Sequence, residues 1–392
     1  MKRDRQRTWT TSGTLATTIA AVLLGCTFVQ AAPPPGKGGG GGGGGEGSAA
    51  YTIVRFAPPD SSSTSSSVED INEQGHAVGA AEVEGGGSEA VHLDLATGVY
   101  TSLQDGFRAE GVNNLNQIVG NTKVADFSLA LFWSGPSAEP AVLLPLAGDV
   151  TSYALAVNDA GIVIGSSYDG VSMTPDGVAL VRGVVWRVAV DADETVHVDG
   201  PVELPPQFAG AVTGAHDINE VVGGAAQIVG DSGYQAVVWT IELDSDGAIV
   251  APEAPVPVGT LEGRGINNFA EACGRMESDS VAWGVPFVAF ADQDAQPLPV
   301  PRGTVFGIAN SINDTEEIVG SLRVLQKGSQ TGYGKEYAYL WKDGNSIDLN
   351  KQIPAKSGWD LKWAEVISNG GIIGGWGQFD VYSRGFLLIA NP

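Results

Sequence analysis

The sequence predicts an all-β fold, a seven-bladed β-propeller made of four-stranded antiparallel blades. Three observations lead to this prediction. A short motif recurs seven times at intervals of 41 to 61 residues, which is the period of a strand-type repeat protein. Short runs of β-branched and aromatic residues, separated by Asn, Asp and Gly, fill each interval. The two ends of the repeat region also supply complementary parts of one blade.

The repeated motif is an apolar strand that runs into Asn, turns, and continues as an apolar pair ending in Gly. Asn at a turn can hydrogen-bond its own backbone two residues further on, and Gly in a strand permits close backbone approach or a bulge. We therefore interpret the motif as structural; the alternative is a site formed by a ring of Asn side chains. The turn positions are Asn72, Asn113, Asn158, Asn219, Asn267, Asn313 and Ser368. The closing glycines are Gly79, Gly120, Gly165, Gly230, Gly274, Gly320 and Gly374, so the fourth motif carries an insertion and the seventh is one residue short.

Each repeat is expected to contain four strands. In the third repeat the first strand, 153–157, ends at Asn158, and the second begins after the turn. The third strand is an apolar run that often closes on Trp, as at 184–186 and 337–341. A weaker fourth strand follows a Gly-containing turn, as at 346–349. Four short strands per repeat are typical of a propeller blade.

The chain ends predict how the ring closes. The last repeat has three expected strands, at 364–367, 372–376 and 385–390, and lacks a fourth. One unassigned strand, 51–56, precedes the first repeat. Pairing it with the last blade would close the ring and cover two sheet edges that otherwise invite aggregation. The propeller is therefore expected to span residues 51–392.

Residues 1–31 have the pattern of a secretory signal peptide. Four basic residues precede a short apolar core at 15–25, and a small-residue cleavage site follows at 29–31. The alternative is a bacterial lipobox that would leave Cys26 lipidated. Residues 32–50 form a Gly- and Pro-rich flexible linker. We expect a secreted protein, extracellular or periplasmic, with a lipoprotein tethered to the outer membrane as the alternative.

The charge balance is strongly acidic, with 45 Asp and Glu against 21 Lys and Arg and a net charge of −24. Such a chain is not expected to bind nucleic acid or anionic membrane surfaces, because both repel a negative surface. The N-terminal apolar run is shorter than the roughly 20 residues that a transmembrane helix needs, and we expect no transmembrane segment. After signal cleavage Cys273 is the single cysteine, at a core-like strand position, so no intramolecular disulfide is expected.

The repeat resembles the HAF-type extracellular repeat of secreted bacterial proteins. The resemblance rests on the pattern Ala-x-x-Ile-Asn-Asp-x-Gly-x-Ile-Val-Gly followed by an Ala-Phe-Leu-Trp-like strand, matched at 154–165, 265–274 and 311–320. The Val-Gly-Thr-Leu segment at 258–261 is similar to the Leu-Gly-Thr-Leu segment of that family. The sequence departs from the pattern at Ser368 and in the fourth repeat. The resemblance implies a bacterial extracellular repeat protein and implies no catalytic residues.

No motif for metal, phosphate or nucleophilic chemistry stands out. Residues 70–75 partly match a calcium loop, but they lack the alternating carboxylates and the closing Glu. Bound Ca²⁺ is therefore kept only as the alternative to no cofactor. No Gly-x-Ser-x-Gly elbow and no glycine-rich phosphate loop before a helix occurs. The histidines have no metal-ligand spacing; they are His76, His92, His197 and His216. We assign no catalytic, cofactor-binding or metal-binding residue.

Loops on a rigid scaffold favour binding as the function. We expect a non-catalytic secreted or cell-surface binding module, not an enzyme, with carbohydrate or protein as ligand. Candidate ligand contacts are Trp359, Trp363, Trp376 and Tyr333, although aromatic residues in strands usually fill the core. The alternatives are a propeller enzyme acting on polysaccharide, as a hydrolase or lyase, and a structural surface-coat component. Acidic residues with strongly perturbed pKa values, converging in the central channel, would favour the enzyme.

Overall fold

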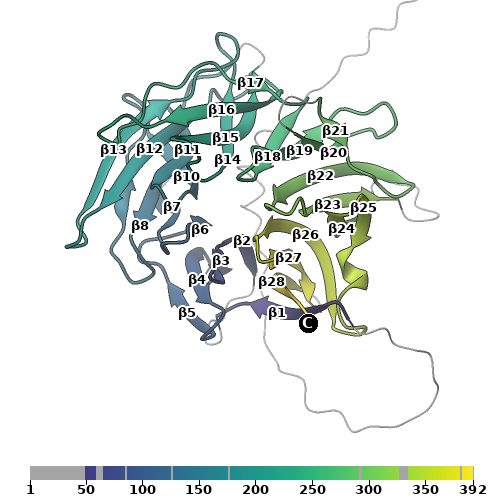
Figure 1. Ribbon diagram of the computed structural model, residues 1–392. Helices are drawn as coiled ribbons and strands as arrows, with labels where there is room; N and C mark the ends of the chain where they lie inside the picture. The colour runs from purple at the N-terminus through teal and green to yellow at the C-terminus, as the bar shows by residue number, and fades with distance from the viewer. Residues whose placement is uncertain are drawn as a thin grey trace, which may run out of the picture.

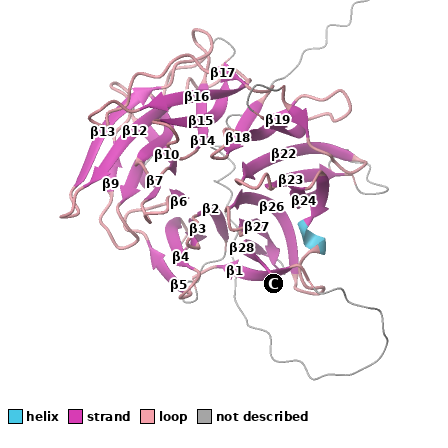
Figure 2. Ribbon diagram, viewed as in Figure 1, coloured by secondary structure: helices cyan, strands magenta, loops and turns pink. Residues whose placement is uncertain are grey.

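The computed structural model describes residues 49–58, 65–83, 86–124, 127–174, 177–290, 294–325, 334–379 and 382–391. They form seven four-stranded antiparallel sheets, arranged as blades around a central channel (Figure 1). One short 3-10 helix, η1 (Leu349–Lys351), interrupts a region that otherwise consists of strands and loops (Figure 2). The predicted seven-bladed propeller is confirmed. The expected signal peptide, the lipobox Cys26 and nearly all of the linker lie outside the described residues.

In blades 1 to 6 the strands follow one another from the channel outward, and the first strands of neighbouring blades contact each other around the channel. Blade 1 contains β2 (Ser66–Ile71), β3 (His76–Glu82), β4 (Ser88–Asp94) and β5 (Val99–Ser102). Blade 2 contains β6 (Arg108–Val112), β7 (Ile118–Val124), β8 (Phe127–Trp133) and β9 (Ala141–Leu143). Blade 3 contains β10 (Thr151–Val157), β11 (Ile162–Tyr168), β12 (Arg182–Val190) and β13 (Val196–Glu203).

The remaining blades follow the same order. Blade 4 contains β14 (Thr213–Ile218), β15 (Ala225–Ser232), β16 (Ala236–Glu242) and β17 (Val256–Pro257). Blade 5 contains β18 (Glu262–Ile266), β19 (Ala272–Met276), β20 (Val285–Ala289) and β21 (Gln296–Pro297). Blade 6 contains β22 (Thr304–Ile312), β23 (Ile318–Val324), β24 (Lys335–Lys342) and β25 (Asn345–Asp348). Blade 7 contains β26 (Trp359–Ile367), β27 (Ile373–Phe379), β28 (Tyr382–Ala390) and, as its outer strand, β1 (Tyr51–Phe56).

The N-terminal strand closes the ring, as the sequence predicts. β1 pairs with β28 in antiparallel register from Tyr51↔Ala390 to Phe56↔Gly385. Phe56 is fully buried and shares a core cluster with Val68 of blade 1 and Leu387 of blade 7. The closing strand therefore covers the edge of β28 and also joins the last blade to the first.

Tryptophans in the third strands anchor the blades, which explains why this strand so often ends in Trp. The indole rings of four blades are buried. Each donates its N–H to a backbone carbonyl in the segment that enters the same blade, at 2.9–3.0 Å; the pairs are Trp133–Gln104, Trp186–Leu144, Trp239–Pro205 and Trp341–Pro299. A buried indole needs such an acceptor, because an unpaired N–H would be costly there. These contacts fix the connection between one blade and the next.

The recurring glycine is required by close backbone approach. At Gly165 a Cβ atom would lie 1.8 Å from the carbonyl oxygen of Tyr153, and the equivalent glycines of the other blades give 1.8–2.2 Å. In blade 7 the equivalent residue is Gly375, which pairs with Ala364 and would place a Cβ 2.1 Å from the Trp363 oxygen. The assignment of Gly374 to this position is wrong. The seventh motif therefore has the same length as the five regular ones.

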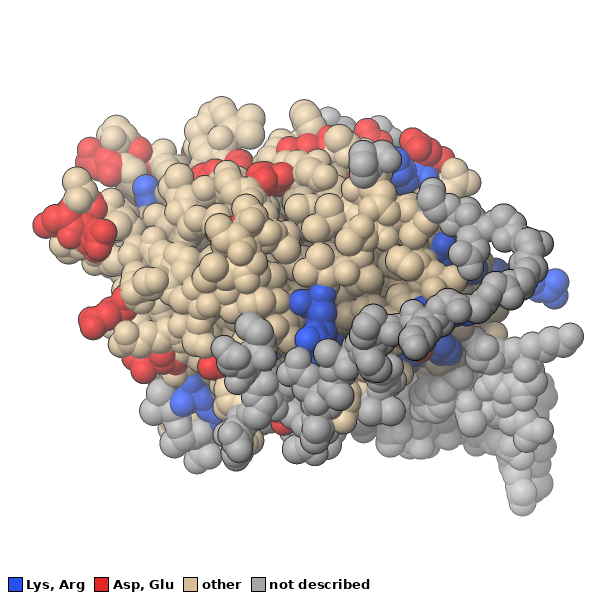
Figure 3. Space-filling model, turned by 90° about the horizontal axis from the view of Figure 1, so that it is seen from below, with Lys and Arg blue, Asp and Glu red and all other residues tan. Residues whose placement is uncertain are grey.

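The charges are unevenly distributed over the outer surface. Acidic side chains gather at the left-hand end in Figure 3, and several basic side chains lie toward its right-hand end. The right-hand end corresponds to blades 5 to 7 in Figure 1. More than half of the chain's Lys and Arg residues, from Arg264 to Arg384, lie in this last third of the sequence.

Candidate functional site in the central channel

The turn asparagines link neighbouring blades. In blades 1 to 6 the Asn side chain donates from Nδ2 to the backbone oxygen of the next blade's turn residue, at 2.9–3.1 Å. The oxygen of the same amide holds the turn; Asn113 Oδ1, for example, accepts from the N–H groups of Leu115 and Gln117. These side chains are buried. Both ends of each amide are thus used within the fold, which supports the structural interpretation of the motif.

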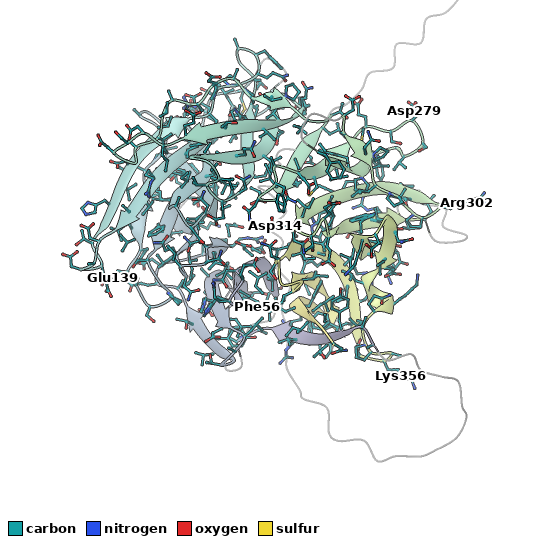
Figure 4. All side chains as sticks on the ribbon, viewed as in Figure 1. Phe56, Glu139, Asp279, Arg302, Asp314 and Lys356 are labelled. Carbon is teal, nitrogen blue, oxygen red and sulfur yellow. The ribbon has the colours of Figure 1, made fainter. Side chains whose placement is uncertain are left out.

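The residues that follow these turn positions form a second circle, which we call the rim ring. In each blade the backbone N–H of this residue donates to the side chain of its counterpart in the next blade, at 2.7–3.1 Å. The circle is closed, because Glu73 accepts from the N–H groups of Asn369 and Gly370. Its seven members are Glu73, Asn114, Asp159, Glu220, Asn268, Asp314 and Asn369. The labelled Asp314 lies near the centre of the ring of blades in Figure 4.

Below the rim ring, every innermost strand carries a β-bulge. In each blade the register with the second strand shifts by one residue near the turn, which leaves one residue of the innermost strand without a partner; β22 and β26 have a second shift of this kind nearer their start. A bulge of this kind re-aims a side chain out of the regular ladder. The seven residues, which we call the bulge ring, are Glu69, Glu110, Leu155, His216, Arg264, Asn310 and Glu365. All of them line the same cavity in the channel.

This cavity, which we call the cup, has a volume of about 250 Å³. The bulge ring and most of the rim ring line it, together with Asp70, Asp217 and Ser311 from the level between them. Ligand pockets for drug-sized molecules usually measure about 300–1,000 Å³. The cup therefore suits a small polar molecule or the end of a longer one.

One side of the cup is rich in carboxylates. Glu69 and Glu110 flank Arg108, with N–O distances of 2.5 Å and 3.0 Å. The side chain of Glu69 is 10% exposed, and its Oε1 atom has no hydrogen-bond partner among the described residues. Burial and the neighbouring Glu69 raise the pKa of Glu365 to about 8, against the opposing effects of Arg108, Arg264 and a hydrogen bond from Trp363. Burial therefore favours the protonated form of Glu365.

The other side of the cup carries basic groups. His216 lies 2.7 Å from Asp231, measured from Nε2 to Oδ1. Arg264 donates from Nη2 to Glu262 at 2.9 Å, and its Nε is buried without a partner in the described part of the chain. Glu262 also pairs with Arg275 at 2.8 Å. The cup thus has an acidic wall formed by blades 7, 1 and 2. Opposite it, blades 4 and 5 form what we call the basic wall, where His216 and Arg264 lie beside the carboxylates of Asp217 and Glu220.

Two buried aspartates join the innermost strands. Asp70 accepts from the N–H groups of Ile71 and of Val112 in the next blade, both at 2.8 Å. Asp217 makes the equivalent bonds to Ile218 and Ile266. Burial raises their pKa values to about 7 for Asp70 and about 6 for Asp217, although these hydrogen bonds lower them. These carboxylates hold the blades at the level just above the bulge ring.

The residues that partly match a calcium loop make hydrogen bonds within the fold. Asp70 is engaged by two backbone N–H groups, and the turn from Asn72 to Gly75 is held by the Asn72 side chain and backbone. No group of three or more His, Cys, Asp or Glu residues in the described ranges is arranged to hold a metal ion.

Within the described ranges, no helix is long and apolar enough to cross a membrane. Cys273 is a buried free thiol.

The structure places the four aromatic candidates differently. Trp363 stacks on Phe306 of the neighbouring blade, with ring centroids 6.2 Å apart, and it donates to Glu365 of the bulge ring. Trp359 packs against Phe379 and Phe386. Trp376 faces Trp363 across the ladder of β26 and β27. Tyr333 lies outside the described residues.

Sequence reasoning missed the bulge ring. Its members share neither charge nor size, so no residue pattern marks them. A positional signal exists, because each one is the third residue before the turn position of its repeat; Glu69 precedes Asn72 in this way, and Glu365 precedes Ser368. Aligning the repeats on the turn residue would have gathered these seven positions in one column.

Comparisons with known proteins bear on the fold. No family model matches the chain, and no curated protein matches it significantly. The β-propeller domain of the Trilobed protease from Pyrococcus furiosus is similar with a TM-score of 0.50 and 11% identity, over 82% of this chain and 95% of that one. Pyrococcus horikoshii acylaminoacyl peptidase gives 0.47 and 12%, over 80% of this chain and 49% of that one. An oligogalacturonate lyase from Vibrio parahaemolyticus gives 0.45 and 11%, over 87% and 93%.

These similarities correct one expectation. The propeller that reaches a TM-score of 0.50 is a domain of a protease, so the inference from a repeat scaffold to a protein that is not an enzyme fails. Its 11% identity carries the fold and no activity. The channel also contains acidic residues with raised pKa values, the feature that the sequence argument names as favouring an enzyme. The chain is a seven-bladed β-propeller.

Proposed function

We propose that the protein binds a small polar molecule, of about the size of one sugar ring, in the cup. The observation that carries this proposal is the convergence of the seven bulge-ring residues, one from each blade, on one cavity of about 250 Å³. Bulges interrupt the ladder of hydrogen bonds, and they occur preferentially where a strand presents a side chain for function. A cup of this size excludes a folded protein domain, so carbohydrate is favoured over protein among the expected ligands.

Ligand-observed NMR tests this proposal with a library of monosaccharides, disaccharides and sugar acids. Leu155→Trp replaces an aliphatic side chain at a bulge position with a larger indole ring, which should fill the cup. Val142→Trp is the matched control, because Val142 is 43% exposed on β9, the outer strand of blade 2. Saturation transfer should appear with the wild type and the control and disappear with Leu155→Trp. Transfer that persists in Leu155→Trp, or no transfer from any sugar, would refute the proposal.

A second candidate function is hydrolysis of a glycosidic bond, favoured by the contrast between Glu365 and Glu69. Burial favours the protonated form of Glu365, while Arg108 pairs with one oxygen of Glu69 and leaves the other without a partner among the described residues. In such a reaction Glu365 would donate its proton to the bridging oxygen as the C–O bond breaks. Glu69 would take a proton from the attacking water. This division between acid and base is the one that glycoside hydrolysis requires.

The second candidate is tested by release of nitrophenol from a panel of aryl glycosides. Glu365→Gln should lower any such activity at least about 100-fold, the usual contribution of a general acid, while leaving binding of the sugar product measurable. If the wild type releases no nitrophenol from any aryl glycoside that it binds, hydrolysis is ruled out and the binding function stands.

Secretion is also part of the proposal, supported by the composition of residues 1–31. Mass spectrometry of the protein from a bacterial host should find the mature N-terminus at Ala32 in the periplasm or medium. An N-terminus at a lipidated Cys26 would establish the lipoprotein alternative, and an uncleaved Met1 would refute secretion.

A further inference from the structure

The chemistry of the bulge ring carries information about the ligand. The seven positions are equivalent in the fold, and backbone pairing defines each bulge. The positions accept side chains as different as Leu155, His216 and Glu365, so the propeller itself does not require any particular residue there. The distribution of residue types around the ring therefore reflects what the cup holds.

The acidic wall offers hydrogen-bond acceptors. Three neighbouring blades contribute Glu365, Glu69 and Glu110 to the cup. Arg108 engages one oxygen of Glu69 and leaves Oε1 without a partner among the described residues. A buried acceptor of this kind is costly unless a donor reaches it. Hydroxyl groups of a ligand are suitable donors, and carboxylates commonly bind them.

The basic wall offers donors. Arg264 uses Nη2 on Glu262 and leaves Nε buried without an acceptor in the described part of the structure. His216, in the neighbouring blade, lines the same wall and pairs with Asp231. Arginine prefers a planar anionic acceptor such as a carboxylate. The Arg264 side chain is 22% exposed through atoms other than Nε and lines the cup, so a ligand there can contact its guanidinium group.

We propose that the ligand is a polyhydroxylated carboxylate, a sugar acid, with its carboxylate at Arg264 and its hydroxyls at Glu69 and the neighbouring glutamates. This inference rests on the proposed function. A neutral sugar would offer the Arg264 guanidinium group a weaker acceptor. A phosphate ester would bring two negative charges close to the acidic wall, where like charges repel. A ligand with a single negative charge at one end and hydroxyls at the other fits both walls.

A free sugar acid and the terminal residue of an acidic polysaccharide present the same carboxylate and hydroxyl groups, so either could supply the ligand. Calorimetry on the full chain distinguishes these sources with galacturonate, glucuronate and their short oligomers. Galactose and glucose are the matched neutral ligands, since each differs from its acid only at one carbon. The comparison of acid with neutral sugar uses the wild type and does not depend on the folding of any variant.

The acids should bind at least about 10-fold more tightly than their neutral counterparts, corresponding to one charge-assisted contact. Arg264→Gln should reduce the affinity for the acids by a similar factor and change the affinity for the neutral sugars less. Glu69→Gln should weaken both classes. Equal or tighter binding of the neutral sugars overturns this inference and leaves the proposed function standing. Absence of binding by every sugar refutes the proposed function itself.

Discussion

Gly165→Ala tests the close approach between the first two strands of a blade. The added Cβ would lie 1.8 Å from the Tyr153 oxygen and 3.0 Å from the Ala154 Cα, whereas real Cβ atoms stay beyond 3.0 Å. β10 and β11 would therefore have to separate by more than about 1 Å beside the bulge at Leu155. Losing two ladder hydrogen bonds at about 1 kcal/mol each, with further packing loss, amounts to about 3 kcal/mol.

The assay is thermal unfolding followed by circular dichroism. A loss of about 3 kcal/mol should lower Tm by about 5 °C in a chain of this length. Gly135→Ala is the matched control, because Gly135 has no left-handed backbone angle and nothing within 4 Å of its ideal Cβ position. A Tm for Gly165→Ala within 1 °C of the control would refute the reasoning. It would show that the sheet absorbs the added atom without separating its strands.

Three further predictions concern pH, the buried thiol and ring closure. Glu365 has a raised pKa of about 8, so its contribution to stability is full below about pH 4.5 and is lost as pH rises through 8. The Tm of Glu365→Gln minus the Tm of the wild type should therefore increase between pH 5 and pH 9. A difference in Tm that stays constant over this range would contradict the prediction. Burial raises the pKa of the Cys273 thiol, so in a Cys26→Ser background a thiol reagent should label the protein only after unfolding, and rapid labelling of the native state would be inconsistent with the buried position. Removing residues 1–56 takes away β1 and exposes the edge of β28, so the truncated chain should associate or aggregate in light scattering, whereas a stable monomer would show that closure is dispensable.

Most of the fold could be predicted because the repeat motif constrains it directly. Asn113 has to stand at the turn, where its amide serves both its own backbone and the next blade. Gly165 has to lack a side chain. The error at Gly374 arose where two glycines are adjacent, and only the register with Ala364 shows that Gly375 occupies the close-contact position.

The candidate site was not predicted, because the bulges leave no mark in the residue types and are signalled only by their constant position three residues before each turn residue. Leu155, His216 and Arg264 occupy equivalent positions although they share no physical property. A strand with strict alternation would place its acidic residues on one face, but each bulge adds a residue and redirects the side chain. The aromatic residues were selected as candidate contacts because of their size. Of these, Trp363 lies beside the cup, since its side chain bonds to Glu365.

A crystal structure of the protein soaked with galacturonate tests the central claim most directly. The account predicts electron density for one sugar ring in the cup, between the bulge ring and the rim ring, with a carboxylate oxygen at about 3 Å from a nitrogen of the Arg264 guanidinium group. A sugar that binds in solution but occupies another surface in the crystal, with the cup holding only water, would contradict it.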